Sequence, residues 1–246
     1  MTKQSGLGDN LYLSGVDLSG DTNSIGQVGG GPAPLEFTGI DKSAYERIGG
    51  ERDGRLSWVS YFNPTGAHPT LSALPTADVH LMYCRGTTLG NPAACMVAKQ
   101  PNYDGKRDTS GAFLFSLDAV ANGFGVEWGT LLTAGKRSDT TATNGTGVDL
   151  TTVSTAFGWQ AYLQVFSFTG TSVTVQLQDS ADNASFANLG AGGAFTAVTA
   201  APGTQRLVSP GATDTVRRYL RVATSGTFSQ ATFAVVFVRN ATAVTF

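Results

Sequence analysis

The chain has 246 residues, of which 14% are charged and 41% hydrophobic, and this length allows one large domain or two modest ones. Its net charge of −2 excludes a strongly basic polymer binder, and its apolar content excludes a chain that is disordered throughout. With 31 glycines and 3 methionines, the composition predicts many short strands and turns rather than long helices.

The first ten residues, MTKQSGLGDN, are polar and lack the apolar segment of a secretion signal. The longest apolar run, residues 233–238, is too short to span a bilayer. We therefore expect a protein that is made in a cytoplasm, has no membrane segment and begins with a flexible arm over residues 1–10.

The N-terminal part is expected to be mainly β-sheet, with strands near residues 35–39, 55–62, 78–86, 93–100, 111–120 and 126–135. One short helix is predicted within HPTLSALP, residues 68–75. Its two leucines are three apart after a proline, and a second proline ends the turn.

Two cysteines flank the turn sequence GTTLGNP and match no zinc or haem pattern. Cys84 and Cys95 could face each other on the two strands of a hairpin. In a reducing compartment we interpret them as buried thiols, and the sequence leaves open whether they pair.

Residues 134–155 are rich in Thr, Gly and Asn and have no apolar period, which is typical of a linker or a long loop. We therefore predict a domain over residues 1–137, a linker over 138–156 and a second domain over 157–246. The first 140 residues carry 11 basic and 14 acidic side chains, a net charge of −3, whereas residues 157–246 carry 5 basic and 3 acidic ones, a net charge of +2.

The second domain is expected to be an antiparallel β-sandwich. In SVTVQLQD, residues 172–179, apolar and polar side chains alternate as in a half-buried strand. Further strands are predicted near residues 161–168, 193–200, 204–209, 217–224 and 231–238.

The sequence predicts no catalytic residue, cofactor or metal site. His68 and His80 have no recognisable catalytic companion, and the glycine-containing segment 129–137 has Arg137 where a phosphate loop needs Ser or Thr. Four glutamates, Glu36, Glu46, Glu51 and Glu127, could serve a glycosidase in pairs, but we interpret them as solvated or intersubunit charges. The three tryptophans could stack on sugars, and we favour their burial in a core or interface; they are Trp58, Trp128 and Trp159.

Three stretches, VDLSGDTNSIG, LEFTGIDKSAYERIGGERDGRLSWVSYFNP and HPTLSALPTADVHLMY, together resemble the major tail tube proteins of long-tailed (siphovirus-type) bacteriophages. In that family an early strand precedes a loop with a characteristic spacing of Ala, Glu-Arg-Ile, Gly and Asp-Gly. An aromatic strand, an Asn/Asp-Pro turn and a short helix then follow. The loop positions here are Ala44, Glu46, Arg47, Ile48, Gly49, Asp53 and Gly54, and the aromatic strand contains Trp58, Tyr61 and Phe62. The resemblance covers roughly residues 7–137.

The resemblance implies a tail-tube-type β-sandwich with one short helix. It also implies self-assembly into hexameric rings that stack into a tube for genome ejection. Such a protein belongs to the virion tail and is assembled in the cytoplasm of the bacterial host. Its implied partners are other copies of itself and the tape measure, tail terminator and tail tip proteins, while DNA passes without specific binding.

Eight charged side chains lie within 17 residues, 39–55, which is unusual in a chain of low charge. We interpret this segment as an intersubunit or inter-ring contact, formed by Asp41, Lys42, Tyr45, Glu46, Arg47, Arg52, Asp53 and Arg55. In FLFSLDAV, residues 113–120, alternate side chains share a face, and we predict that Ser116 and Asp118 face the channel.

Residues 157–246 are then an added C-terminal sandwich, immunoglobulin-like or jelly-roll-like. It could pack only on its neighbours or contact glycans of the host surface, with Trp159, Tyr162, Arg217 and Arg218 as candidates. The alternatives to a tail tube subunit are a capsid decoration protein, another tail protein or a carbohydrate-binding module.

Overall fold

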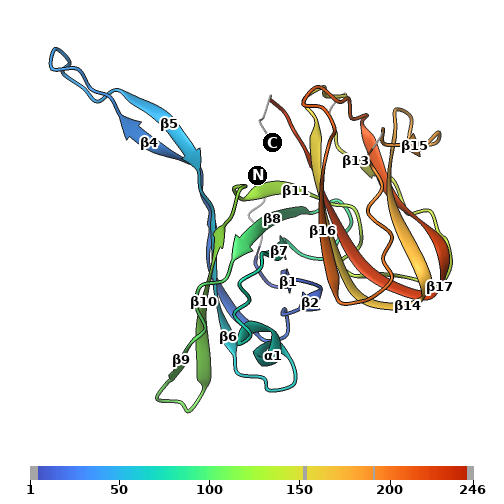
Figure 1. Cartoon of the computed structure of the whole chain (residues 1–246), viewed down its shortest axis with the longest axis horizontal. Coiled ribbons are helices and arrows are strands. Elements are labelled where there is room, and N and C mark those ends of the chain that lie inside the picture. Colours follow the sequence, from blue (N-terminus) through green and yellow to red (C-terminus); the bar gives the residue numbers. More distant parts are fainter. Residues whose placement is uncertain (1–4, 152–153, 191, 243–246) are drawn as a thin grey trace. The chain divides into compact units, whose positions relative to one another are not determined.

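Antiparallel strands make up most of the chain, and one short helix, α1 (Ala67–Leu71), lies among them (Figure 1). The computed structural model describes residues 5–151, 154–190 and 192–242. The prediction of a mainly β fold with one short helix is confirmed. Residues 1–4 of the predicted flexible arm and residues 152–153 of the predicted linker lie outside the described residues.

The chain forms two compact units, each assembled from separate segments. Unit 1 consists of Met1–Gly20, His80–Cys95 and Trp128–Phe246, and unit 2 consists of Asp21–Val79 and Met96–Glu127. These units interleave along the sequence and differ from the predicted linear division into residues 1–137 and 157–246. The difference arises because strand pairing joins segments that are far apart in the sequence.

Two long strands, β14 (Trp159–Ser180) and β17 (Tyr219–Arg239), form the centre of unit 1 and pair along their whole length. Strand β17 also pairs with β11 (Glu127–Leu131), β12 (Arg137–Asp139) and β13 (Val148–Asp149). Strand β14 also pairs with β15 (Ala187–Asn188) and β16 (Gly203–Val208). The remaining strands of this unit are β1 (Asn10–Leu13), β2 (Val16–Asp17), most of β7 (Val79–Cys84) and the first half of β8 (Pro92–Lys99).

The core of unit 1 consists of large apolar side chains from both long strands and from the loops that cover them, among them Trp159, Leu177, Phe195, Phe233 and Phe237. The predicted alternation in residues 172–179 is confirmed, since Val173, Val175 and Leu177 are buried. Two sheet faces that bury such residues against each other give the predicted sandwich.

Four of the strands predicted for residues 157–246 form only two continuous strands in the structure. Segments 161–168 and 172–179 are both parts of β14, and segments 217–224 and 231–238 are both parts of β17. Gly170 and Gly226 lie inside these strands with φ values of 152° and 123°, and the register shifts on both sides of Gly170. Glycine allows such a bulge to absorb the irregularity, so the strand continues. Residues 193–200 form only isolated bridges to β14, at Ala194 and Val198.

The segment predicted as a linker, residues 138–156, is paired with neighbouring strands at several points. It contains the end of β12 and all of β13, and Asn144 and Thr155 form bridges to Ala223 and Val216. Arg137, at its start, donates to the carbonyl of Val222 at 2.9 Å and to the carboxylate of Asp139 at 2.8 Å. Polar side chains therefore fix the position of this segment, although its sequence has no periodic pattern of apolar residues.

Unit 2 is built on a sheet of β3 (Thr22–Gly29), β6 (Arg55–Tyr61), β10 (Phe113–Ala121) and β9 (Asp104–Arg107), joined by the end of β8. One face of this sheet packs against α1, with Leu56, Trp58, Leu71, Phe115 and Leu117 buried. The buried side chain of Gln100 donates to the carbonyl of Leu71 at 2.8 Å and fixes the end of the helix. Two further strands, β4 (Pro32–Glu36) and β5 (Arg47–Arg52), form a separate two-stranded sheet.

Both cysteines are buried and are not joined in a disulfide, as we interpreted from the sequence. Burial, reinforced by the charges of Asp9 and Asp17, raises the pKa of the Cys84 thiol to about 12. The carboxylate of Asp9 accepts hydrogen bonds from Tyr83 at 2.5 Å and from Arg85 at 2.8 Å. The predicted flexible arm therefore does not include Asp9. No helix among the described residues is long and apolar enough to cross a membrane.

Candidate assembly surface

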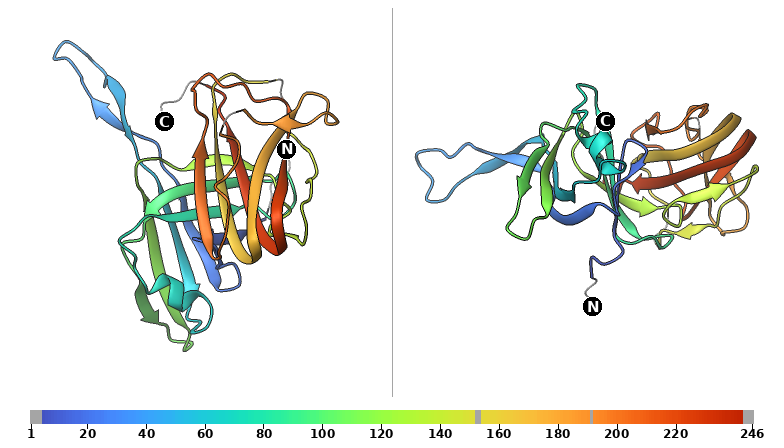
Figure 2. Two further views of the ribbon diagram at one scale, coloured as in Figure 1. Left: turned by 45° about the vertical axis from the view of Figure 1, so that its right-hand side comes forward. Right: turned by 90° about the horizontal axis from the view of Figure 1, so that it is seen from below.

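The hairpin of β4 and β5 extends from one end of the sheet of unit 2 and is called here the hairpin arm, residues 31–53 (Figure 2). Leu35 pairs with Ile48 and Glu36 with Arg47. At its base, the backbone N–H of Asp53 donates to the carbonyl of Gly31 at 3.1 Å. Near its tip, the N–H of Phe37 donates to the carbonyl of Glu46 at 3.0 Å. The arm is therefore an ordered ladder with a closed base.

Local sequence explains both the entry into the arm and its free edge. Gly30, with φ 150°, lies where a side chain would collide with Asp53 and Gly54 on the opposite strand. The N–H of Phe37 points toward β5, and backbone N–H groups alternate in direction along a strand. The backbone nitrogen of Pro34, three residues earlier, therefore faces away from β5. Proline has no N–H to offer there, which disfavours pairing with a further strand. The arm is thus suited to contacts through its side chains.

Five large apolar side chains of the arm are exposed: Leu35 (44%), Phe37 (63%), Ile40 (109%), Tyr45 (67%) and Ile48 (54%). Leu35 and Ile48 are cross-strand partners, and Phe37 is two residues beyond Leu35, so these three share one face. Ile40 and Tyr45 lie in the loop at the tip. Grouped exposed apolar side chains mark an interaction surface in a water-soluble fold.

The polar contacts of the arm are all internal. Lys42 lies 3.5 Å from the carboxylate of Glu46 and 3.8 Å from that of Asp41, and the Arg47 guanidinium lies 4.8 Å from the ring centroid of Tyr45. Exposed ion pairs of this kind contribute about 0–1 kcal/mol each. Within the described residues, the hydrogen bonds and ion pairs of residues 32–52 go to other residues of the arm. The core of unit 2 therefore gains little stability from the arm.

Seven of the eight predicted contact residues, Asp41 to Asp53, lie on the arm. Asp53 lies at its base, where its carboxylate accepts from the N–H of Gly54 at 2.7 Å. Arg55 lies on β6, and its guanidinium is paired with Asp118 at 2.7 Å. The apolar residues of the arm were missed, although Leu35, Phe37 and Ile40 stand out as apolar residues in a polar segment.

Ser116 and Asp118 lie on the more exposed face of β10, while Phe115, Leu117 and Ala119 are buried on the other. The expected alternation of faces in this strand is therefore observed. The Asp118 carboxylate accepts from Arg55, and the N–H of Asp118 donates to Asn102 at 2.8 Å. Its charge is compensated within unit 2, and its orientation toward a channel stays a prediction.

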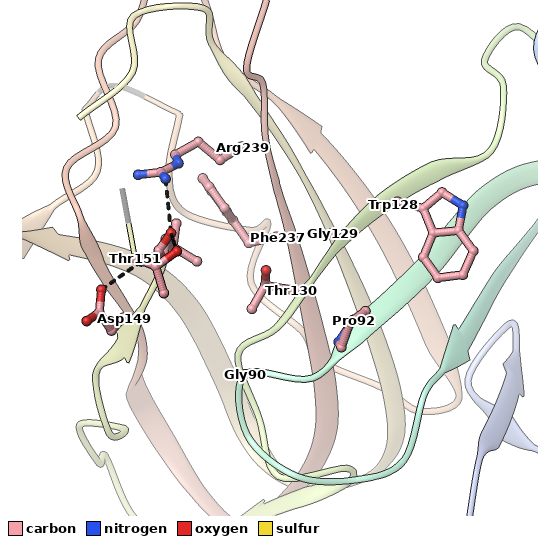
Figure 3. A pocket seen from close by; sticks show the side chains of 10 residues that line it. Gly90, Pro92, Trp128, Gly129, Thr130, Asp149, Thr151, Phe237 and Arg239 are labelled. Atoms are coloured by element: carbon pink, nitrogen blue, oxygen red, sulfur yellow. Dashed lines mark hydrogen bonds between the residues drawn. The ribbon is translucent and has the colours of Figure 1, made fainter. Parts of the chain in front are cut away.

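An open pocket in unit 1 has a volume of about 370 Å³ and is lined by Trp128, Asp149, Thr151, Phe237 and Arg239, among others (Figure 3). The Asp149 carboxylate accepts from Arg218 at 2.7 Å and from the N–H of Thr151 at 2.7 Å, and these bonds lower its pKa to about 2. Burial lowers the pKa of Arg239, while the charge of Asp149 acts in the opposite direction. The carboxylate oxygens of Asp149 thus already accept hydrogen bonds from Arg218 and Thr151.

The aromatic residues considered for sugar binding differ in exposure. Trp58 and Trp159 are buried, as we favoured, whereas Trp128 is 49% exposed at the pocket rim. Tyr162 is buried, and Arg217 is bound to Asp179 at 2.7 Å. The side chains of Trp159 and Tyr162 are therefore unavailable for stacking on a glycan. Across residues 5–151, 154–190 and 192–242, no three His, Cys, Asp or Glu side chains are grouped so that they could hold a metal ion.

Comparisons with known proteins give one family and several solved structures. The family model Bbp16 matches residues 138–236, which is less than half of the chain. Among curated proteins, none matches.

Three solved structures are similar in part. The virion of a native gene transfer agent particle contains a chain with 11% identity and a TM-score of 0.41, and the match covers 51% of this chain and 98% of that one. The SPP1 Dit protein, from the adsorption apparatus of phages that infect Gram-positive bacteria, gives 11% identity, a TM-score of 0.37 and coverage of 94% and 98%. A chain of the phage P2 baseplate in its activated conformation with Ca gives 9% identity and a TM-score of 0.30, and the match covers 94% of this chain and 98% of that one. At TM-scores below 0.5 these similarities assign no role, so a functional assignment depends on the geometry of the arm and the resemblance of residues 7–137.

Proposed function

We propose that this chain is a structural, non-enzymatic subunit of a phage virion whose copies are joined by the hairpin arm. One observation carries this proposal: the arm exposes five large apolar side chains and makes all its polar contacts internally. In finer detail, we propose the major tail tube subunit, which forms hexameric rings that stack into a conduit for DNA. The resemblance of residues 7–137 supports this finer assignment.

The energetics of association fit an arm of this kind. Burying an exposed Leu, Ile or Phe side chain contributes about 1.5–3 kcal/mol. Association itself opposes binding by about 4–15 kcal/mol, so several such side chains must be buried together. A closed ring lets every copy use its arm once and receive another arm once, and this doubles the contacts per subunit.

The experiment is negative-stain imaging of the purified full-length protein beside the double variant Phe37→Ser/Ile40→Ser. We expect rings or tubes for the native chain and monomers for the variant, with equal thermal midpoints. Leu74→Ser is the matched control, because Leu74 is an exposed apolar residue of unit 2 outside the arm, and this variant should assemble normally. A native chain that is monomeric at every concentration, or a double variant that assembles like the native chain, would contradict the proposal.

A capsid decoration protein is the second candidate. The family-model match, residues 138–236, lies outside the part that resembles tail tube proteins, residues 7–137, so the chain contains more than a minimal tube subunit. A decoration protein would bind to preformed shells and would not form tubes by itself. Co-sedimentation with empty phage shells separates the two roles.

A further inference from the structure

A second exposed apolar surface lies in unit 2, at the end of the sheet opposite the arm. Its exposed rings, Phe62 and Phe113, belong to a cluster of five ring side chains that is called here the aromatic patch: Phe62, His68, Tyr103, Phe113 and the buried Phe115. Phe62 and Phe113 are 40% and 43% exposed, and their ring centroids lie 5.6 Å apart. Tyr103 stacks on Phe115 at 3.9 Å, and the hydroxyl of Tyr103 lies 2.8 Å from Nδ1 of His68. These internal contacts give the exposed rings a fixed platform.

Two cations and two carboxylates border the aromatic patch, in and just after β9 (residues 104–108). Strand β9 is exposed along its length, and Arg107 pairs directly with Phe113. The carboxylates nearby are engaged within the chain: Asp104 accepts from Asn102 at 2.8 Å, and Asp108 accepts from Ser110. Among the described residues, neither Lys106 nor Arg107 has a carboxylate partner within ion-pair distance. Residues 104–108 carry two cations and two carboxylates, so their net charge is zero, and Lys106 and Arg107 are the cations free to meet carboxylates of a partner.

The hairpin arm carries a net negative charge. Residues 31–53 contain five carboxylates and three cations, a net charge of −2. Glu36 and Glu51 have no ion pair among the described residues, and Lys42 is already shared by Asp41 and Glu46. The arm and the patch thus both expose apolar side chains, and the unpaired carboxylates of the arm can meet the unpaired cations beside the patch.

The arm of one copy cannot reach the patch of the same copy. The arm leaves the sheet next to Arg55, which pairs with Val120, whereas the patch lies at the end where Tyr61 pairs with Leu114. These ends are separated by the length of β6, about 20 Å, and the arm extends in the opposite direction (Figure 1). The partner of the patch must then be a second molecule.

We infer that the hairpin arm of one copy docks on the aromatic patch of a second copy, with the exposed face of Leu35, Phe37 and Ile48 against Phe62 and Phe113. This inference rests on the proposed self-assembly and identifies its receiving surface. The contact is made by side chains, because Pro34 disfavours the addition of a strand at the arm's outer edge. It joins two different surfaces, so repetition gives a ring or an open filament rather than a closed dimer.

The test is cross-linking between two single-cysteine variants mixed in equal amounts. Ser43→Cys places a thiol at the tip of the arm, and Thr109→Cys places one in the turn beside the patch, with no patch residue altered. The native thiols of Cys84 and Cys95 are buried and should not react with a bis-maleimide. We expect covalent dimers from the mixture and few from either variant alone.

Gln27→Cys is the matched control for the receiving thiol, because Gln27 is exposed on β3 toward the arm end of the sheet. Ser43→Cys mixed with Gln27→Cys should give only background dimers. Equal yields with Thr109→Cys and Gln27→Cys, or strong cross-linking of Ser43→Cys alone, would overturn the inference, the latter in favour of arm-to-arm contact.

Charge reversal provides a second measurement with a rescue. Lys106→Glu/Arg107→Glu in the Thr109→Cys chain should lower the dimer yield about tenfold, because two attractive pairs worth up to about 1 kcal/mol each are lost. Glu36→Arg/Glu51→Arg in the Ser43→Cys chain should restore it, because Glu36 and Glu51 are arm carboxylates without an ion pair among the described residues. An unchanged yield, or a failure of the rescue, would contradict docking at this surface.

The outcomes separate this inference from the proposed function. If assembly requires the arm but the Ser43–Thr109 cross-link is absent, the receiving surface is wrong and self-assembly through the arm stands. If the native chain does not assemble at all, both proposals are wrong.

Discussion

Two arginine–aspartate ion pairs of the chain differ in burial, and burial determines how much each pair contributes to the free energy of unfolding. Asp179 is 5% exposed and accepts three hydrogen bonds from Arg217, two from its guanidinium and one from its backbone N–H, at 2.7 to 2.9 Å. The Arg55–Asp118 pair of unit 2 has similar distances but is more exposed. Water screens the exposed pair and weakens its contribution.

We therefore expect Asp179→Asn to lower the free energy of unfolding by roughly 2–3 kcal/mol, because charge-assisted bonds to a buried carboxylate are lost. Asp118→Asn, the control, should change it by less than about 1 kcal/mol. Urea denaturation of the three proteins measures both values. Equal effects would show that burial does not distinguish the two pairs.

The pH dependence of stability is expected to contain a contribution from Asp149. Hydrogen bonds from Arg218 and Thr151 lower its pKa from 3.8 to about 2 in the folded state. A lowered pKa means that the stabilisation is complete above pH 3.8 and is lost as the pH falls toward 2. The native chain should then melt above Asp149→Asn at pH 6, and the two midpoints should converge near pH 2. A constant difference across this range would contradict the assignment.

Sequence reasoning identified the charges of the arm better than its apolar residues. Lys42, Glu46 and Arg47 were conspicuous because the rest of the chain is poor in charge. Leu35 and Phe37 were read as ordinary strand residues, since a pattern of alternating side chains does not say whether anything covers them. Exposure depends on the tertiary neighbours of a strand, and β4 has only β5.

At the scale of elements, the two long strands of unit 1 show where local signals mislead. Glycines usually end or bend strands, and two predicted strands end at residues 168 and 224, shortly before Gly170 and Gly226. In the structure Gly170 lets β14 continue through a bulge, whereas Gly226 stays in register opposite Val173, and a side chain on Gly226 would collide with the carbonyl oxygen of Ser172. Pairing along both long strands outweighs the local preference.

Gly226→Ala should accordingly destabilise the protein by about 1–3 kcal/mol, because alanine is strained at a φ of 123° and has no room there. Gly20→Ala is the control, since no atom lies within 4 Å of the added methyl group and the φ of Gly20 lies outside the positive range that strains an alanine. Thermal melting of both variants compares them. A Gly226→Ala variant as stable as the control would show that β17 can adjust its backbone at this position.

At the scale of the whole molecule, the mainly β class and the short helix followed from composition and turn signals. The division into units did not, because each unit combines segments that are separated by dozens of residues. Strands β1 and β7, for example, pair within unit 1 although 65 residues lie between Leu13 and Val79. Such long-range pairing leaves no periodic signal in the sequence.

The central claim is that the arm serves assembly and not the stability of the subunit. Since Asp53 donates to Gly31 at 3.1 Å, the two ends of the arm are adjacent, and an Asn-Gly turn can replace residues 33–51. Sedimentation velocity of this deletion variant, with thermal melting of the same sample, is the most direct test. We expect a monomer at every concentration at which the native chain assembles, with a melting midpoint within about 2 °C of that of the native monomer. Native-like assembly of the deletion variant, or a fall of its midpoint by more than about 5 °C, would contradict the claim.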